Sequence, residues 1–407
     1  MANQYEDEAN NHGDESDIDD IDGESFARSK GRPNVGVTPS QVKEMFDLGF
    51  SVTQMAARFC VSRPTIYKLL RNTDIEHSQR FTVVNDDELD RIICQIKEAH
   101  PNAGEINVIG HLRARKIRVQ RQRVRASIHR VDPQGPSERS SRNFHPRVYE
   151  TPCPNYVWHL DGNHKLVKWG FVTHLAIDGF TRLITFGETS NNNQAETVME
   201  KFTRAVEKYG RPLRVRTDHG GENVRVWQDM IHHRGPNSVI AGSSVRNQRV
   251  ERLNGDVNVQ VNRELEFEEK LNIANSTDKF CLHYAYLPRI NKTMADFINA
   301  HNCHNISTEG SATPQQLMYA YRHLTELHHS ILHSTPYPTV SVQELLQNPT
   351  ALPYVDVLPS VYQLPNDVFN ELREVVNPLA ESNDKGKDIY METVKFVGDY
   401  LTGAQPS

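Results

Sequence analysis

The sequence has few of the features of secreted, membrane or nucleotide-binding proteins. Its 407 residues include five scattered cysteines and no CxxC pair. Such an odd, dispersed set argues against a disulfide framework, gives no indication of structural zinc and is typical of a reducing compartment. No apolar run reaches the roughly 18 residues of a membrane helix, and the N-terminus has no apolar leader. The sequence has no Walker A motif and no dinucleotide fingerprint, so we expect no nucleotide cofactor. Because no apolar run is long enough for a membrane helix, we also expect no membrane partner.

Charge is abundant but unevenly distributed along the chain. Residues 1–26 carry 10 acidic and no Lys or Arg residues, residues 27–150 have a net charge of +9, and residues 331–407 have a net charge of −6. At about 100–200 residues per domain, the length predicts two or three domains. A basic segment behind an acidic head suggests nucleic-acid binding joined to another activity. On the charge pattern alone, ordinary solvated surface charge is an equally good explanation.

Three segments give no sign of a core of their own. We expect residues 1–37 to be a disordered acidic head and linker, because they hold too few large apolar side chains to offset the entropy of ordering. Residues 132–155 are rich in Pro, Ser and Arg and are interpreted as a linker. The acidic tail, residues 331–407, shows no repeat and suggests no function.

Residues 38–75 predict a helix-turn-helix. Short helices are expected over Pro39–Leu48, from about Ser51, and over Arg63–Arg71. Cys60 occupies the turn, a position that usually prefers glycine. The outer side of the third helix is basic, and an ordinary three-helix core without DNA is the alternative. The residues expected to reach DNA are Arg63, Tyr67, Lys68 and Arg71.

A second helical module is predicted over residues 84–131. Its first helix has a 3.6-residue apolar stripe, and its third helix begins near Gln120. The segment His111–Arg130 holds eight Lys or Arg residues and no acid. A helix whose outer side lacks large side chains can enter the major groove, and the arginines on either side of it would contact the phosphates. A nuclear-import signal or a solvated helix are the alternatives. The candidate DNA contacts are Gln122, Arg123, Arg125 and Arg130.

Residues 156–330 have the mixed pattern of an α/β domain. The order β-β-β-α-β-α-β-α predicts a mixed sheet covered on both faces. The expected strands are 156–166, 170–177, 183–186, 213–217 and 238–241. The expected helices are 194–209, 222–232, 247–267, 280–302 and 313–327.

Three acidic residues stand at strand and helix ends of this domain. Asp161 is on the first strand, Asp218 ends the fourth, and Glu251 is in the first turns of the 247–267 helix. Adjacent strand ends can bring the two aspartates together, and a helix packed beside them can add Glu251. Carboxylates gathered in this way repel one another unless cations lie between them, and Mg²⁺ or Mn²⁺ accepts such ligands. Two ions about 4 Å apart would serve phosphoryl transfer.

Other polar residues of the domain have alternative interpretations. Asp178 suits a turn better than a catalytic site, and Glu222 and Asp229 are expected to be surface carboxylates. One edge of the 247–267 helix is polar and is either solvated or in contact with DNA. That edge consists of Glu251, Asn254, Asn258 and Asn262. Further candidates for phosphate contact are Lys165, Gln248 and Arg249.

The contexts of the three acids, W-H-L-D-G-N-H-K, T-D-H-G-G-E-N and N-Q-R-V-E-R-L-N, resemble the catalytic signatures of the retroviral-integrase and DDE-transposase core. The resemblance runs from about Val157 to Leu317, where T-P-Q-Q-L matches a common ending. It is closest to eukaryotic integrase-core proteins with upstream helix-turn-helix modules. It implies an RNase H-like fold and metal-dependent DNA strand transfer, with Asp161, Asp218 and Glu251 as the triad. The gaps of 56 and 32 residues suit the family, although the second is slightly shorter than the commonest retroviral form.

The resemblance also sets expectations for the whole protein. It implies a transposon-encoded or transposon-derived integrase that acts in the nucleus, as a homo-oligomer on DNA ends, with two bound Mg²⁺ or Mn²⁺ ions. A domesticated DNA-binding regulator with an inactive core is the main alternative, since a triad can outlast its activity. An RNase H-like nuclease without strand transfer is the third possibility.

Overall fold

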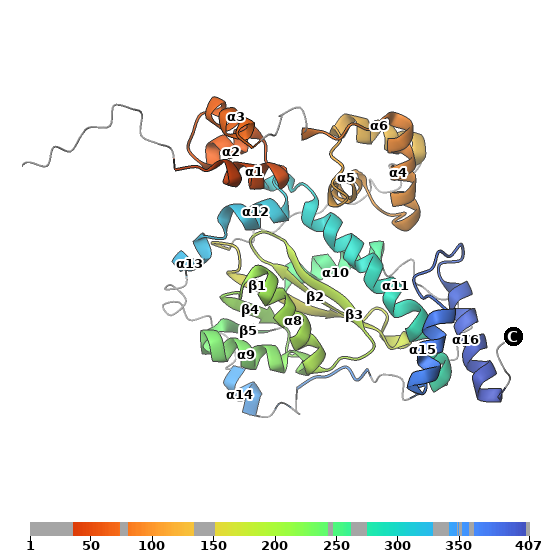
Figure 1. The fold of residues 1–407 in the computed structure, drawn as a ribbon. Coiled ribbons are helices and arrows are strands. Elements are labelled where there is room, and N and C mark those ends of the chain that lie inside the picture. Colours follow the sequence, from red (N-terminus) through yellow and green to blue (C-terminus); the bar gives the residue numbers. More distant parts are fainter. Residues whose placement is uncertain are drawn as a thin grey trace, which may run out of the picture.

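The computed structural model describes residues 36–73, 80–133, 151–242, 247–261, 275–328, 342–347, 349, 352–357 and 362–403. The expectation of disorder for the acidic head falls almost entirely outside these residues, as do Asn262 and most of the linker. A five-stranded mixed sheet forms the centre of the molecule (Figure 1). Its strands are β1 (Val157–Asn163), β2 (Val172–Asp178), β3 (Ile184–Ser190), β4 (Arg214–Thr217) and β5 (Val239–Ala241).

The order of the strands across the sheet is β3-β2-β1-β4-β5. The first three strands pair antiparallel, whereas β4 runs parallel to both β1 and β5. β3 is longer than expected, because its pairing with β2 continues as far as Ser190 opposite Val172. The sheet agrees with the predicted mixed α/β architecture.

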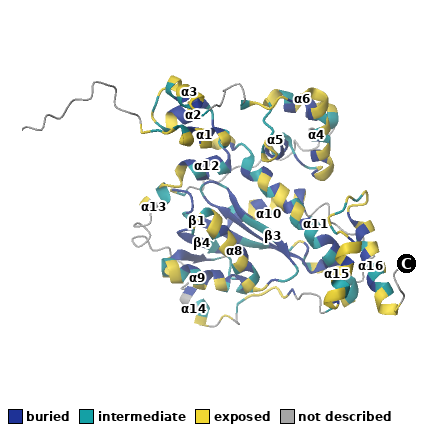
Figure 2. Ribbon diagram, viewed as in Figure 1, coloured by how far each residue is buried: buried dark blue, intermediate teal, exposed yellow. Residues whose placement is uncertain are grey.

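Helices cover both faces of the sheet. One face packs against α8 (Ala195–Tyr209) and α9 (Val224–Arg234), and Trp158, Phe202 and Trp227 lie in the shared core. The other face packs against α10 (Gln248–Gln260) and α11 (Ser276–Cys303). Figure 2 shows that burial follows the strands and the inner sides of these helices. The expected 222–232 helix begins instead with the 3-10 turn η3 (Gly221–Asn223) before α9.

Two helical modules lie on one side of this domain, next to α11 and α12 (Pro314–Tyr321) (Figure 1). The first module consists of α1 (Pro39–Asp47), α2 (Val52–Arg58) and α3 (Arg63–Arg71), close to the predicted bounds. Thr38 and Ser51 begin the first two helices as capping boxes. Cys60 has a φ of 52°, which explains why its position usually prefers glycine.

The second module consists of α4 (Asp86–Ala99), α5 (Glu105–Ala114) and α6 (Arg121–Val131). Its core holds the predicted stripe, with Leu89, Ile93 and Ile96 fully buried. After α12, the single helix expected over 313–327 is interrupted, and α13 (Leu324–His328) follows separately.

The described parts of the acidic tail pack on the domain. They comprise α14 (Val342–Gln347), the segment 352–357, α15 (Asn366–Val375) and α16 (Lys387–Thr402). Leu372 and Val397 join the same hydrophobic core as α11. None of the helices in the described part of the chain is both long and apolar enough to span a bilayer.

Candidate active site

The alternation of side chains along β1 decides which of its residues face α10. Trp158 and Leu160 point into the core under α8 and α9. Side chains of a strand alternate between its two faces, so His159, Asp161 and Asn163 point to the opposite side. β1 therefore presents three polar side chains in a row toward α10.

Each of these side chains meets an asparagine of the α10 segment. His159 Nδ1 lies 2.7 Å from Oδ1 of Asn247, which directly precedes α10. Asn254 Nδ2 donates to Asp161 Oδ2 at 2.7 Å, and Asn163 Nδ2 donates to Asn258 Oδ1 at 3.0 Å. The three residues of β1 are two positions apart, so they lie on one face of the strand. Asn247, Asn254 and Asn258 are seven and four positions apart, so they lie on one side of the α10 segment. We call these three pairs the asparagine ladder.

The asparagine ladder explains the polar edge that the sequence left open between solvent and DNA. Asn254 and Asn258 hold α10 against β1, and they do so through side chains that β1 points at them. Asn254 was expected to contact DNA. Its amide nitrogen is instead committed to a carboxylate, while its Oδ1 is buried and has no hydrogen-bond partner.

Asp218 follows β4 directly, and β4 is the parallel neighbour of β1. Parallel neighbours end at the same edge of a sheet, so Asp218 stands at the edge toward which Asp161 lies. Asp218 Oδ1 accepts hydrogen bonds from Gly220 N and Asn223 Nδ2, both at 3.1 Å. These bonds fix the carboxylate on the loop between β4 and α9.

Glu251 lies in the first turn of α10, one turn before Asn254, and its side chain is exposed. The pKa of Asp161 is raised to about 7 by burial and by the negative charges of Asp218, Glu251 and Glu222. The fold thus places Asp218 and Glu251 close enough to Asp161 for their charges to raise its pKa. As they are placed, no three His, Cys, Asp or Glu side chains of the described residues surround a common metal position.

Glu222 was predicted to be a surface carboxylate, and this prediction is wrong. Its side chain is buried in η3, and burial together with the charge of Asp218 raises its pKa to about 7. A Cβ at Gly220 would lie 2.3 Å from Glu222 Oε1, so any other residue at this position would displace the carboxylate. The segment H-G-G-E directly after Asp218 was the sequence signal. The assumption of a solvated helix hid it. Asp229 is also largely covered, in an ion pair with Arg211.

Asp178 is a turn residue, as predicted. It is fully buried at the end of β2. Its Oδ2 accepts from Asn155 N at 2.8 Å, and its Oδ1 accepts from both the backbone N and the Oγ1 of Thr181 at 2.7 Å. Burial raises its pKa to about 6. The bonds from Thr181 close the connection between β2 and β3, and the bond from Asn155 ties this turn to the segment before β1.

The other candidates of the domain lie around the same edge. Lys165 is exposed in the turn after β1, where its backbone N donates to Asn163 Oδ1. Gln248 is the first residue of α10. Arg249 follows it. Burial of His159 lowers the pKa of that imidazole to about 4, and the positive charges of Arg216 and Arg249 contribute to the decrease.

The two helical modules present their basic residues differently. In the first module, Arg63, Lys68 and Arg71 are exposed on α3, and within the described residues none of them forms an ion pair. Tyr67 lies between them and is 38% exposed. The outer side of α3 therefore carries unbalanced positive charge.

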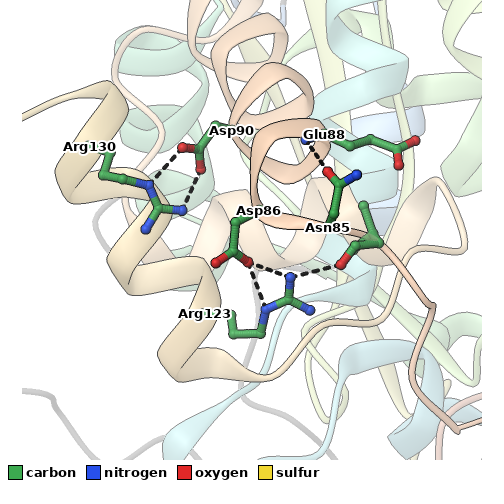
Figure 3. Close-up of polar contacts among 7 residues, drawn as sticks. Asn85, Asp86, Glu88, Asp90, Arg123 and Arg130 are labelled. Atoms are coloured by element: carbon green, nitrogen blue, oxygen red, sulfur yellow. Dashed lines mark hydrogen bonds and ion pairs between the residues drawn. The ribbon is translucent and has the colours of Figure 1, made fainter.

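In the second module the candidate arginines are ion-paired. Arg123 contacts Asp86, and Arg130 forms two hydrogen bonds of 2.7 Å with Asp90 (Figure 3). Arg125 pairs with Glu105, which also contacts Arg121. Gln122 is exposed on the same helix. Four of the eight basic residues in this run are thus balanced by acids from α4 and α5.

A mixed sheet of order β3-β2-β1-β4-β5 with helices on both faces defines an RNase H-like domain, as expected. Residues 148–331 match the sequence model of the family described as the integrase core domain. This segment of the chain is an integrase core domain, which confirms the resemblance noted in the sequence.

Solved structures similar to the chain include two retroviral ones. The HTLV-2 integrase catalytic core domain in complex with magnesium, in its trimeric form, is 19% identical with a TM-score of 0.29, over 42% of this chain and 99% of that one. The simian T-cell lymphotropic virus intasome in complex with PP2A regulatory subunit B56 gamma is 14% identical with a TM-score of 0.36, over 56% and 72%. A comparison with curated proteins found no match.

Proposed function

We propose that this protein cuts DNA and joins DNA strands, using Asp161, Asp218 and Glu251 as its catalytic carboxylates. The observation that carries the proposal is the unbalanced charge at the β1, β4 and α10 edge of an integrase core domain. Asp161 is held there with a pKa near 7 beside other acids. None of the three forms an ion pair with Lys or Arg among the residues that the structure describes. The reaction class is in-line displacement at phosphorus, first by water and then by a DNA 3′-hydroxyl.

The donor set fits a divalent cation. Carboxylates without cationic partners are hard oxygen ligands, as Mg²⁺ and Mn²⁺ require, and the buried, unbonded Asn254 Oδ1 lies beside them. Asp161, Asp218 and Glu251 would hold the metal, with two ions as the expected number. When bound, the metal supplies positive charge that stabilises the attacking and leaving oxygens of phosphoryl transfer.

The chain's own side chains would orient the reacting groups. The bond from Asn254 fixes one oxygen of Asp161 and leaves the other available. The bonds from Gly220 and Asn223 do the same for Asp218. Lys165, Gln248 and Arg249 surround this edge and would contact the DNA phosphates beside the cut.

DNA recognition belongs in this proposal to the helical modules. The exposed side of α3, with Arg63, Tyr67, Lys68 and Arg71, would enter the major groove and read bases. Gln122 and the arginines of α6 would contact DNA only after exchanging their acidic partners for phosphate. The proposal includes a nuclear location and assembly of several copies on DNA ends.

The test is strand cleavage and joining by full-length Asp161→Asn, Asp218→Asn and Glu251→Gln proteins in Mg²⁺ and in Mn²⁺. Each change keeps the shape of the side chain and removes the charge that holds the cation, so both reactions should fall by orders of magnitude. Folding and gel shifts should persist, because relief of repulsion among acids does not destabilise the metal-free protein. Wild-type joining rates in any of the three would overturn the assignment. DNA binding without cleavage by the wild-type protein would favour the regulatory alternative.

A further inference from the structure

The first helical module shares its hydrophobic core with the integrase core domain. Ala320 of α12, only 7% exposed, belongs to the same buried cluster as Met45, Met55 and Ile66 of the module. Tyr319 packs against this cluster, with its ring 6.3 Å from that of Phe50. Two residues from the far end of the integrase core domain thus complete the core of a module that lies more than 240 residues earlier in the chain.

Polar contacts surround this junction. Tyr319 donates its hydroxyl to Glu44 Oε2 at 2.6 Å. Gln316 Nε2 donates to the carbonyl of Leu48 at 3.1 Å, and Arg58 Nε donates to the carbonyl of Ala320 at 3.2 Å. Two of the three acceptors are backbone oxygens at helix ends, whose positions do not depend on a side-chain rotamer. Such bonds resist rotation of the module about α12.

The second helical module strengthens the same junction. Arg118 donates to the carbonyls of Phe46 and Asp47, at the C-terminal end of α1. The second module is itself packed closely on α11, where a Cβ at Gly110 would lie 2.3 Å from the carbonyl oxygen of Ala300. Both modules and the integrase core domain therefore meet along α11 and α12.

The docked side of the first module is not its DNA-facing side. α1 and α2 supply the contacts with α12, whereas α3 lies on the far side of the module (Figure 1). Arg63, Lys68 and Arg71 remain exposed there. DNA can thus be bound by α3 without opening the junction.

We propose that the α12 junction is a specificity device that fixes the number of base pairs between the sequence bound by α3 and the bond that the integrase core domain cuts. The proposal rests on the function proposed above. Gln316, Tyr319 and Ala320 are the positioning residues: they touch neither DNA nor the reacting atoms, and they act through the placement of the module.

The magnitude of the effect follows from the alternative connection. Without the α12 junction, the first module would be joined only through residues 72–85 to the second module, which stays packed on α11. A flexible chain of these 14 residues would have a root-mean-square span of roughly 20 Å. At about 3.4 Å per base pair, that span corresponds to roughly 6 base pairs of uncertainty. A docked module reduces this spread to one or two adjacent positions.

The first experiment maps cuts at nucleotide resolution on a duplex that contains a site selected by the full-length protein. The wild type should cut at one or two adjacent positions. Ala320→Glu inserts a charge into the shared core and should spread the cuts over roughly 6 base pairs, with little change in total cutting. The matched control is Tyr321→Ala, which removes an aromatic ring from the next residue, where it packs on Phe180 of the integrase core domain instead. The control should keep the wild-type pattern.

A second measurement does not depend on strand cleavage by the protein. An iron chelate attached to Glu251→Cys, in a background with Cys60, Cys94 and Cys303 changed to Ser, would cut DNA by radicals where the integrase core domain lies. A narrow pattern should broaden when Ala320→Glu is added. This measurement still works if the wild type proves inactive, so failure of the proposed function and failure of the junction are distinguishable.

Two results would overturn the proposal: scattered radical cuts with the intact junction, or an unchanged narrow pattern after its disruption. If Ala320→Glu no longer binds the selected site, Gln316→Ala combined with Tyr319→Phe decides instead. These changes remove two junction bonds and leave the core of the first module apolar. A pattern as narrow as that of the wild type in this double variant would equally reject the junction as a positioning device.

Discussion

The pKa values of carboxylates shift in opposite directions at the β1, β4 and α10 edge and in the second helical module. In the module, the pKa of Asp90 is lowered by its hydrogen bond with Arg130. Burial alone would raise the pKa of Glu105, but the bonds from Arg121 and Arg125 lower it. At the edge of the sheet, burial and neighbouring acids raise the pKa of Asp161 to about 7.

The difference indicates which charges hold the protein together and which are left for a ligand. Charge that is balanced inside the chain stabilises a structure, and its groups are already occupied. Charge that stays unbalanced in a folded protein favours a partner of opposite sign. The same comparison applies to the basic residues: those of α6 are ion-paired, whereas those of α3 have no ion pair with any described residue.

The largest expected effect compares two acids of the core domain: Asp178, which accepts three hydrogen bonds, and Asp161, which accepts one from Asn254 and lies beside other acids. Asp178→Ala leaves three donors from Asn155 and Thr181 without their acceptor. At about 1–3 kcal/mol for each buried group, unfolding should become easier by at least about 3 kcal/mol. Asp161→Asn should be neutral or stabilising in metal-free protein. Urea unfolding at pH 8 measures both, and equal losses would remove the distinction between the two acids.

The next effect concerns the unpaired basic residues. Lys68→Ala and Arg71→Ala should weaken binding to a selected site more than binding to random DNA, by about 1–3 kcal/mol each, because base contacts discriminate and phosphate contacts do not. Lys43→Ala is the matched control, since Lys43 is an exposed lysine of the same module that pairs with Asp47. Equal losses on both DNAs would mean that Lys68 and Arg71 touch only phosphate.

These contrasts also explain what could be predicted from the sequence. The sheet, both modules and the convergence of Asp161, Asp218 and Glu251 follow from local periodicity and from motif context. The partners of the α6 arginines do not, because Asp86 and Asp90 lie 37 and 40 residues before them. A run without acids appears unbalanced only as long as its tertiary neighbours are unknown.

The interpretation of Glu222 failed for a related reason. A helical pattern was extended over the segment after Asp218, and a charged residue at its start was expected to face solvent. The 3-10 turn changes the direction of that side chain and buries it beside Asp218. The asparagine ladder was also beyond prediction, because it needs the strand and helix registers together, although each period is visible alone.

A smaller effect is expected in the pH dependence of the metal-free protein. The pKa of Asp161 is about 7 when folded and near 4 when unfolded, so the folded state binds more protons between these values. The free energy of unfolding should therefore fall as pH rises from about 4 to about 7, by about 1–2 kcal/mol after solvent screening. Asp161→Asn should flatten the profile, and saturating Mg²⁺ should restore stability at pH 8. A wild-type profile that rises across this range would contradict the charge imbalance.

The smallest effect is expected where charges are balanced. If Arg123, Arg125 and Arg130 all met phosphate, replacing them with Gln would lower the salt slope of DNA binding by about 3. Each must first leave an acid of its own module, so we expect a clearly smaller decrease, measured as log K against log salt. Glu105→Gln sharpens the measurement, because it releases Arg125 and should make the slope steeper. A decrease of the full 3 units would break the comparison, since it would show that DNA opens these ion pairs and that balanced charge in this protein is also available for binding.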